Sequence, residues 1–350
     1  MAKTAIEFAN VSIVFGDEPL SALPHMDAGK TRAEVKEATG QVLGVHNCSL
    51  KVAEGEILVL MGLSGSGKST LLRAVNALNP VCRGSVLVNT PKGRVDVSHA
   101  KGAELLNVRR HQIAMVFQQF GLLPWRSVRE NVGLGLELGG MSKAARRAKV
   151  EEQLELVGLA QWADVRVGEL SGGMQQRVGL ARAFATDAPI LLMDEPFSAL
   201  DPLIRAKLQD ELLELQAKLK RTIIFVSHDL DEAFKLGNRI ALMEGGRIVQ
   251  VGTAREIIAN PIDEYVQDFV AHMNPMGVLT AEDLAEDPAD APPANGAADV
   301  AAAPVLNAHT PVKEVMHLLR THPMVALEDG RKITREGVIG KLIDPQGSAA

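Results

Sequence analysis

Short apolar runs alternate with longer amphipathic stretches along most of this chain. The runs AIEFANVSIVF, QVLGVHNCSLKV, EILVLM, IAMVF, PILLMDE and TIIFV each predict a β-strand. Helical periodicity occupies residues 69–77 and 142–157, and it returns after ELSGG and after Asp201–Pro202. Strands and helices that alternate in this way predict an α/β fold, with a mainly parallel sheet covered by helices on both faces.

Local signals mark where several of these elements begin and end. Asp201 is a predicted N-cap and Pro202 takes the first helical position. The apolar stripe of that helix predicts a core face made by Ile204, Leu208, Leu212, Leu215 and Leu219. A hairpin is predicted from GSVLVN and GRVDVS, with the turn at residues 90–93.

A polar insert at residues 16–40 separates the first two strands. Within it, TRAEVKEATG predicts a short helix, because Thr31 and Glu34 form a capping box and Gly40 can end the helix. Near Asn274 the composition changes, and residues 281–304 are rich in Ala, Pro and acidic residues without a single basic one. This composition predicts a flexible acidic linker. The following stretch predicts a helix and two short strands.

Composition and charge restrict the class of protein. The 350 residues are 46% hydrophobic but only 3% aromatic, so aliphatic side chains must supply most of the core. The formal net charge of −6 argues against an open nucleic-acid surface. Cys48 and Cys82 lack CxxC spacing and are expected to be free core residues in a reducing compartment. We expect neither a signal peptide nor a membrane span, so a membrane role requires partner chains.

The stretch MGLSGSGKST carries the strongest chemical signal. Gly62, Gly67, Lys68 and Ser69 match the G-x-x-x-x-G-K-[ST] phosphate-loop pattern, placed between a predicted strand and a predicted helix. The loop amides and the helix N-terminus form an anion nest. Lys68 then reaches the β- and γ-phosphates, and Ser69 offers its hydroxyl to Mg²⁺. The alternative is a flexible Gly/Ser-rich turn. The predicted nucleotide-binding residues of this phosphate loop are Gly62, Leu63, Ser64, Gly65, Ser66, Gly67, Lys68, Ser69 and Thr70.

A second acidic site follows a second strand. ILLMDE places Asp194 and Glu195 at the carboxyl end of a strand, where α/β sheets bind ligands. We expect Asp194 to hold Mg²⁺ and Glu195 to orient or deprotonate the attacking water. The alternative is an acidic pair at a solvated strand end, and the phosphate loop makes that alternative weaker.

Further polar residues stand at strand ends or helix starts. Gln118 follows IAMVF and can contact the metal and the lytic water, although a plain loop glutamine is the alternative. His228 follows TIIFV and can grip the γ-phosphate, or it can be structural. Ser171 can be a simple N-cap. Gly172 and Gly173 cost stability at a helix start, which the close approach of a phosphate would justify.

Taken in order, these motifs resemble a known family. The set GLSGSGKST, VFQQ, LSGGMQQR, ILLMDEP, SALD and SHD is similar to the nucleotide-binding subunit of ATP-binding-cassette transporters, over residues 5–273. The resemblance implies ATP and Mg²⁺ as cofactors and an ATPase domain at 1–273 with an antiparallel β subdomain and a helical subdomain near 119–185. A linker at 274–304 follows, and after it comes a short segment at 305–350, which is interpreted as the remnant of a CBS-like module.

The resemblance also implies that two copies of the chain share each ATP site. Ser171, Gly172, Gly173 and Gln175 would complete the partner's site, and Asp201 would lie across the interface. The usual signature has Gln where Met174 stands, but the phosphate-facing residues are kept. Phe15 would stack on the adenine.

A membrane partner is implied as well. Gln118 and FGLLPWRSV would contact the coupling helix of a permease, so Trp125 is either a packing residue or a partner contact. The insert and the motif context look like importers of quaternary amines such as glycine betaine, proline betaine or choline, closest to the choline type. The implied partners are a permease and a substrate-binding protein at the cytoplasmic face of the bacterial inner membrane, with no nucleic acid. The tail is too short for a complete pair of CBS modules.

Other functions stay open at this point. An importer of another small solute, such as an amino acid, nitrate or a sulfonate, would carry the same motifs. A cassette ATPase acting on DNA or ribosomes usually has two cassettes or a long coiled coil, which this chain lacks. The LSGG segment argues against a P-loop kinase or GTPase, and a nucleotide-sensing regulator would show no turnover.

Overall fold

The computed structural model describes residues 3–271, 280–285, 303–308, 310–335 and 337–338. The chain divides into two compact units. The first comprises Met1–His228 with Ala241–Val249, and the second comprises Asp229–Ile240 with Gln250–Ala350. Among the described residues, no helix has both the length and the apolar character that a bilayer crossing requires.

A six-stranded sheet forms the centre of the first unit, in the order β10-β9-β3-β8-β7-β6. Strands β3, β8, β7 and β6 pair in parallel. Every residue of these four strands is buried, as expected for a parallel sheet covered on both faces. The predicted parallel sheet is therefore confirmed. The strands are β3 (Ile57–Met61), β6 (Ile113–Val116), β7 (Ile190–Asp194), β8 (Thr222–Val226), β9 (Arg239–Glu244) and β10 (Arg247–Gly252).

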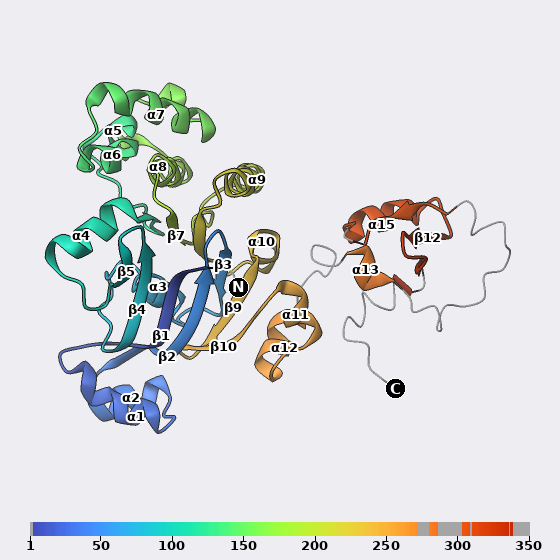
Figure 1. The fold of residues 1–350 in the computed structure, drawn as a ribbon, viewed down its shortest axis with the longest axis horizontal. Helices are drawn as coiled ribbons and strands as arrows, with labels where there is room; N and C mark the ends of the chain where they lie inside the picture. Colours follow the sequence, from blue (N-terminus) through green and yellow to red (C-terminus); the bar gives the residue numbers. More distant parts are fainter. Residues whose placement is uncertain (1–2, 272–279, 286–302, 309, 336, 339–350) are drawn as a thin grey trace. The chain divides into compact units, whose positions relative to one another are not determined.

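A second, antiparallel sheet has the strand order β2-β1-β4-β5 (Figure 1). Its strands are β1 (Thr4–Phe15), β2 (Val42–Ala53), β4 (Arg83–Thr90) and β5 (Gly93–Asp96). The predicted hairpin is β4–β5, in which Thr90 pairs with Gly93. Because β1 pairs with β2 as far as Phe15 opposite Val42, the insert between them leaves the sheet and returns to the same place.

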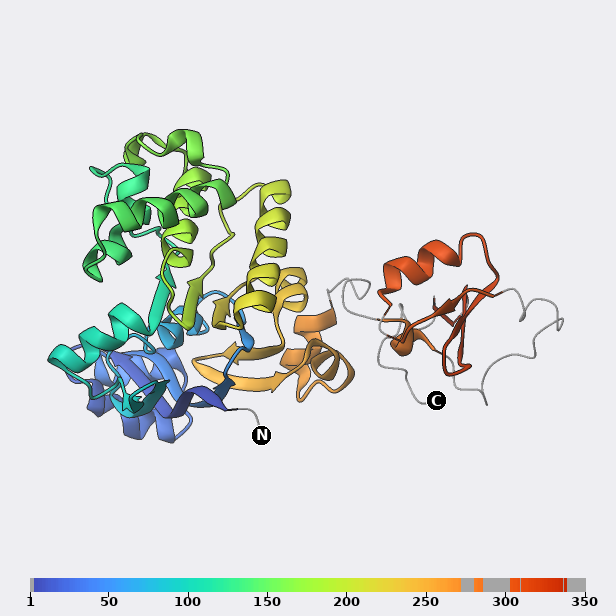
Figure 2. The ribbon, with the colours of Figure 1, turned by 45° about the horizontal axis from the view of Figure 1, so that its top comes forward.

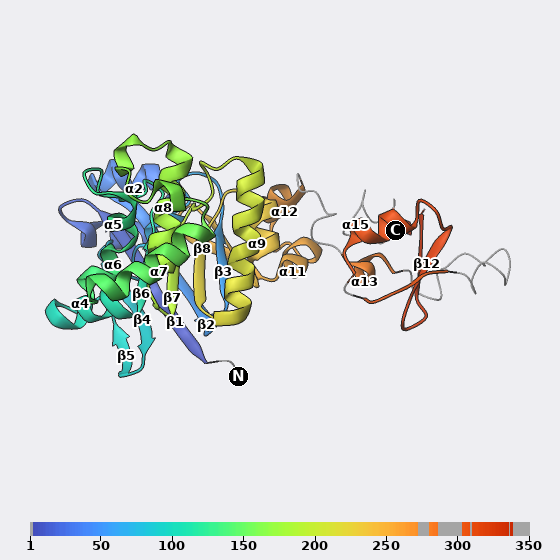
Figure 3. The same ribbon diagram turned by 90° about the horizontal axis from the view of Figure 1, so that it is seen from above.

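Helices α3 (Lys68–Leu72), α4 (Gly102–His111) and α9 (Pro202–Leu219) belong to the same unit. The helix predicted at residues 69–77 ends early: α3 stops at Leu72 and turns follow, with Ala77 at φ 55°. Helix α4 was not predicted, because only its Val108 is buried and its apolar periodicity is weak. Figure 3 shows α9 running alongside β8.

The helices between β6 and β7 gather into one cluster (Figures 1 and 2). The helix predicted at 142–157 is α7, and Ser142 caps it by accepting from the amide of Ala145 at 3.4 Å. Helix α8 begins directly after Ser171. The members of the cluster are α5 (Val128–Val132), α6 (Leu134–Leu138), α7 (Lys143–Leu156), η2 (Ala160–Trp162), η3 (Val167–Glu169) and α8 (Gly172–Phe184).

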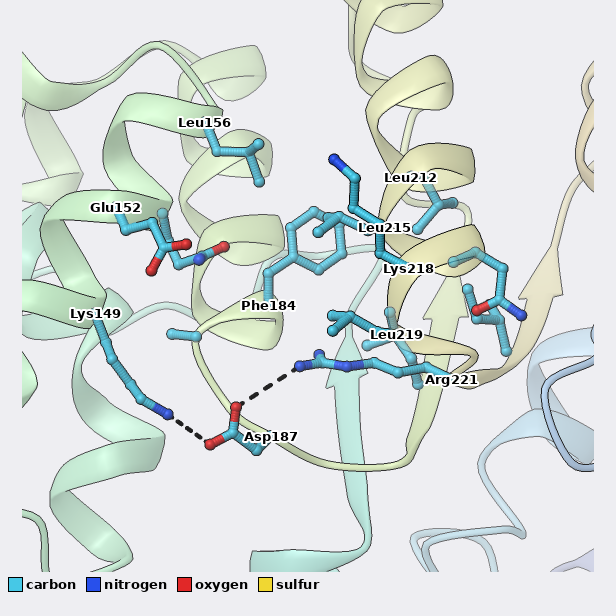
Figure 4. A pocket seen from close by; sticks show the side chains of 15 residues that line it. Lys149, Glu152, Leu156, Phe184, Asp187, Leu212, Leu215, Lys218, Leu219 and Arg221 are labelled. Carbon is cyan, nitrogen blue, oxygen red and sulfur yellow. Dashed lines mark hydrogen bonds and ion pairs between the residues drawn. The ribbon is translucent and has the colours of Figure 1, made fainter.

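The predicted core face of α9 is only partly correct. Leu208 and Leu212 are buried, whereas Ile204 and Leu215 are half-buried and Leu219 is 53% exposed. The reason is a cavity of about 480 Å³ that opens between the end of α9 and the helical cluster. Leu215 and Leu219 line this cavity instead of packing into the core (Figure 4).

An acidic side chain closes one side of the cavity. The carboxylate of Asp187 forms an ion pair with Lys149 Nζ of α7 at 2.5 Å (Figure 4). It forms a second, longer ion pair at 3.9 Å with Arg221, which directly precedes β8. Phe184, at the end of α8, forms part of the apolar wall. The helical cluster is thus tied to the sheet by one carboxylate that serves two cations.

The helix predicted in the insert is confirmed as α2 (Arg32–Thr39), whereas the two shorter helices before it, η1 (Pro19–Ala22) and α1 (Leu23–Asp27), were not predicted. Thr31 and Glu34 form the capping box of α2, and Gly40 ends the helix at φ 71°. A small apolar cluster joins the insert to the antiparallel sheet. Its buried members are Val14, Ala22, Met26, Val35 and Leu43.

The second unit contains α10 (Leu230–Leu236), α11 (Ala254–Ala259) and α12 (Glu264–Ala271), and near its end α13 (Ala281–Leu284), β11 (Val305–Leu306), α15 (Val312–Leu318), β12 (Met324–Leu327) and β13 (Lys332–Thr334). The last segment adds one strand to the predicted helix and two strands, since β11 lies parallel to β12. Residues 281–285 differ from the predicted linker, because α13 buries Ala281 and Leu284 against α15 and β12. Most of the predicted linker lies outside the described residues.

Both cysteines are free, as expected. Cys48 is buried on β2 and Cys82 is half-buried. Burial raises the pKa of the Cys48 thiol to about 11. Neither thiol therefore forms a reactive thiolate at neutral pH.

Candidate nucleotide-binding and hydrolysis site

One cavity of about 540 Å³ collects most of the predicted site residues. The end of β1, the insert, the phosphate loop and the segments after β6, β7 and β8 all contribute to it. Because parallel strands end at the same edge of the sheet, motifs far apart in sequence meet there. The lining residues are Phe15, Arg32, Val42, Leu43, Gly44, Ser64, Gly65, Gly67, Lys68, Ser69, Thr70, Gln118, Glu195 and His228.

The backbone of the phosphate loop has a shape that glycine alone adopts without strain. Gly62, Gly65 and Gly67 have φ of 139°, 79° and 104°. A Cβ on Gly62 would lie 2.1 Å from the carbonyl oxygen of Met243. The Lys68 ammonium donates to the carbonyls of Gly62 at 2.7 Å and Leu63 at 3.0 Å.

Lys68 lies within the electrostatic field of two carboxylates. Burial lowers the pKa of the Lys68 ammonium, and the carboxylates of Glu195 and Asp194 oppose this effect. A buried cation between a loop of backbone amides and two carboxylates has the arrangement that triphosphate binding requires.

Replacing Gly62 with alanine is expected to destabilise the chain by about 1–3 kcal/mol, because the new Cβ meets the Met243 carbonyl and the φ is closed to L-residues. The free energy of unfolding in urea, without nucleotide, measures this. Gly172→Ala is the matched control, since no heavy atom lies within 4 Å of a Cβ there. Equal stabilities of the two variants would contradict the steric argument.

Asp194 is the most enclosed acid of the site. It is fully buried and accepts from Ser69 Oγ at 2.6 Å. Arg73 donates to its other oxygen from Nε at 3.1 Å and Nη2 at 2.8 Å. The described residues hold no cluster of three His, Cys, Asp or Glu side chains suited to a metal. A hydroxyl next to a carboxylate still fits Mg²⁺, which takes few protein ligands and completes its shell with phosphate and water oxygens.

Glu195 follows directly, in an uncommon conformation. Its φ of 48° lies in the left-handed region, which non-glycine residues enter rarely and often at functional sites. The Glu195 carboxylate accepts from Gln118 Nε2 at 3.2 Å and lies 3.4 Å from His228 Nδ1. The buried Gln176 holds the turn, because its amide donates to the Glu195 carbonyl at 3.1 Å and accepts from the Ala199 amide at 3.0 Å.

The predicted adenine side lies at the end of β1. Phe15 is 39% exposed and lines the cavity, although the insert follows it directly in sequence. Gly44 makes room for the ring, since a Cβ there would lie 2.9 Å from Phe15 Cε2 and 3.0 Å from Thr70 Cγ2. The stacking of adenine on Phe15 stays a prediction.

The signature residues do not line this cavity. Ser171 accepts from the Met174 amide at 3.4 Å, so it is the N-cap of α8. Gln175 donates to the Leu170 carbonyl at 3.0 Å, and Asp201 caps α9 by accepting from the Ile204 amide at 3.0 Å. Within one chain these residues have structural partners, while the side chain of Ser171 and the position of Gly172 remain exposed.

Three residues of the site were missed from the sequence. Arg73 lies one turn after Ser69, and that spacing beside a phosphate loop was the available signal. Gln176 belongs to the signature segment. This segment contains two neighbouring glutamines, and which of them is buried depends on the packing of α8. Arg32 belongs to the insert, and its partners are backbone carbonyls far away in sequence.

Known proteins with similar sequences place these observations in one family. A family model described as ABC transporter matches residues 45–198. The glycine betaine/proline betaine transport system ATP-binding protein ProV of Escherichia coli is 50% identical over 280 residues, which are 80% of this chain and 69% of ProV. The choline transport ATP-binding protein OpuBA of Bacillus subtilis is 40% identical over 236 residues, 67% of this chain and 60% of OpuBA. Of these two relatives, ProV is the more similar in sequence, and both belong to the group of quaternary-amine transport proteins that the motifs resemble.

Solved structures agree with the sequence similarity. The dimeric structure of MJ0796, a bacterial ABC transporter cassette, has a TM-score of 0.61 and 32% identity, and covers 71% of this chain and 98% of MJ0796. A post-hydrolysis state of that cassette, bound to ADP and Pi, has the same TM-score. The shared fold and the 50% identity to ProV show that this chain belongs to the family of ABC transporter ATP-binding subunits.

Proposed function

We propose that this chain binds Mg²⁺ and ATP between two of its copies and hydrolyses the ATP to drive solute import through membrane partner chains. The observation that carries this proposal is the meeting of Lys68, Ser69 and Glu195 in one cavity. A cation for phosphates, a hydroxyl beside a buried carboxylate and a second carboxylate for water are the parts that phosphoryl transfer needs.

Each part of the site takes one task. Lys68 and the loop amides stabilise the negative charge on the transferring phosphoryl group, which is the main source of catalysis in this chemistry. Glu195 accepts a proton from the attacking water or orients it. Gln118 and His228 touch the Glu195 carboxylate, and we assign them to hold it toward the water and the γ-phosphate.

Ser69 and Asp194 would hold Mg²⁺, with Gln118 as a further oxygen ligand. The ion would neutralise charge on the β- and γ-phosphate oxygens. Arg73 holds Asp194 in place, because a buried carboxylate needs a charged partner.

A second copy of the chain would supply the signature residues. Ser171, Gly172, Gly173 and Gln175 do not reach the cavity of their own chain, and Ser171 and Gly172 face solvent. The helix N-terminus that follows Ser171 is suited to the γ-phosphate of the partner's nucleotide. Asp201 would lie across the same interface. The dimeric state of MJ0796 supports this assembly.

A permease would bind on the helical cluster. Trp125 is 69% exposed, which favours its role as a partner contact over internal packing. An apolar groove of about 340 Å³ lies nearby, with Phe117, Leu134 and Leu138 among its lining residues. The groove is lined by Phe117, which directly precedes Gln118 in the sequence, so a helix docked there would sense the nucleotide site. Such docking would place the chain at the cytoplasmic face of the membrane.

We propose a quaternary amine such as glycine betaine or choline as the imported solute. The names of the related transport proteins support this class. A substrate-binding protein of the same importer would present the solute. The domain organisation proposed above, with the ATPase at 1–273 and a separate end segment at 305–350, is consistent with this function.

Replacing Lys68 with alanine is expected to weaken ATP binding about 10- to 100-fold, since a charge-assisted contact of about 1.5–3 kcal/mol is lost. Titration with a fluorescent ATP analogue measures the dissociation constant. Lys36→Gln, which removes a cation from the exposed face of α2, is the control. Unchanged affinity in the Lys68 variant would refute the proposed function.

A further inference from the structure

The insert contributes a cation to the nucleotide site. Arg32 is the first residue of α2, and its guanidinium lines the same cavity as Lys68. Nη1 donates to the carbonyl of Gly65 in the phosphate loop, and Nη2 donates to the carbonyl of Gly44 on β2 at 2.6 Å. One side chain thus joins the loop that holds phosphates to the strand that borders Phe15.

The space around this guanidinium is built from glycine backbone. A Cβ on Gly246 would lie 3.0 Å from Arg32 Nη2 and 2.9 Å from the Gly44 carbonyl. A Cβ on Gly67 would also lie 2.9 Å from that carbonyl and 3.5 Å from Nη2. Side chains at these positions would crowd the slot. The planar fork of arginine matches two carbonyls on different elements, which the point charge of lysine does not.

Removing the Arg32 guanidinium from water costs free energy, so contacts at this particular position must offset that cost. Burial lowers the pKa of the guanidinium, although arginine stays charged at neutral pH. Its Nε atom is buried with no hydrogen-bond partner. A half-buried cation beside the phosphate loop gains when polyanionic phosphate is near, because partial exclusion of water strengthens the interaction.

The insert is held firmly enough to place this side chain. Asp27 at the end of α1 accepts hydrogen bonds from both terminal nitrogens of Arg83 at 2.7 Å. It also forms a hydrogen bond with Nε2 of His46 on β2 at 2.9 Å. The hydrogen bonds from Arg83 keep the pKa of Asp27 well below its usual range. Met26 and Val35 of the insert are fully buried in the apolar cluster. Asp27, Arg83 and His46 do not line the cavity, so this charged anchor and the nucleotide contact are separable.

We propose that Arg32 is a positioning residue for nucleotide binding: it fixes the phosphate loop against the adenine-side strand, and it makes the insert part of the ATP site. This inference rests on the proposed function, since it assigns a role to Arg32 within the same site. It acts on the loop in the unassembled chain and therefore affects affinity more than the chemical step.

The test compares Arg32→Gln with Arg32→Lys. We expect Arg32→Gln to raise the dissociation constant and the KM for ATP about 10-fold, while kcat at saturating ATP changes by less than about twofold. Arg32→Lys should lose a smaller part of the affinity, because it keeps the charge but reaches one carbonyl. Titration with a fluorescent ATP analogue and steady-state hydrolysis provide both readouts.

Asp27→Asn separates positioning from simple support of the insert. It removes the charged anchor but no group that touches the phosphate loop, so we expect a lower urea midpoint with near wild-type affinity. If Asp27→Asn and Arg32→Gln give the same pattern, Arg32 merely supports the fold. If Arg32→Gln fails to fold, Arg32→Lys decides, and wild-type affinity in that variant overturns the proposal.

Lys68→Ala in the same titration distinguishes a failure of the role assigned to Arg32 from a failure of the proposed function. If Lys68→Ala loses affinity and Arg32→Gln binds like the wild type, this inference falls and the proposed function stands. If Lys68→Ala itself binds ATP normally, the proposed function falls. Lys36→Gln, on the same helix as Arg32, controls for a general loss of positive charge.

Discussion

Replacing Glu195 with glutamine is expected to lower kcat for ATP hydrolysis about 10²- to 10⁴-fold, the usual contribution of a general base. Glutamine keeps the size of the side chain and can still meet Gln118 and His228, but it cannot take a proton from water. Because Glu195 holds a left-handed backbone conformation fixed by Gln176, the substitution leaves the turn in place. ATP binding should therefore survive.

The Glu195 variant is also expected to change the oligomeric state of the chain. A chain that binds ATP but does not cleave it should accumulate as a closed dimer, which size-exclusion chromatography with ATP and Mg²⁺ detects. Glu104→Gln, on the exposed side of α4, is the control. Glu232→Gln is less suitable, because the Glu232 side chain is largely buried. Hydrolysis by the Glu195 variant at a near wild-type rate would show that another group activates the water.

The sequence was informative where chemistry depends on local order. The phosphate loop requires glycines at fixed spacing, and Asp194 with Glu195 had to follow a buried strand. Those residues were predicted, and the structure brings most of them into one cavity. The capping box of Thr31 and Glu34 was predicted for the same reason, since both partners lie within one helical turn.

Tertiary contacts account for what the sequence did not reveal. Arg32 joins Gly65 and Gly44, and nothing in a window around the insert points to either carbonyl. Leu215 and Leu219 repeat with helical periodicity, yet a cavity rather than a core faces them. Periodicity identifies the apolar face of a helix but does not identify what that face meets.

Replacing Gly172 with arginine is expected to abolish most ATP hydrolysis while the chain still folds and binds ATP. Among the described residues, no heavy atom beyond the sequence neighbours and the backbone of the same helix lies within 4 Å of a Cβ at this position, so the new side chain extends into solvent. Lys68 and Ser69 are untouched, and the affinity of the single chain should stay near wild type. The loss would arise only when a second copy approaches and the arginine blocks its γ-phosphate. Ala144→Arg, on the exposed side of α7, controls for the added charge.

A mixture of two inactive variants tests the shared site directly. In a dimer of Gly172→Arg with Lys68→Ala, one site combines the intact phosphate loop of the first chain with the intact signature of the second, and the other site carries both defects. Hydrolysis by the mixture should therefore exceed the sum of the low activities that the two variants show alone. Full activity of Gly172→Arg as a monomer would mean that each chain completes its own site. Differently tagged chains show whether mixed dimers form. If mixed dimers form and hydrolysis does not recover, one intact site is insufficient, which would contradict two independent composite sites.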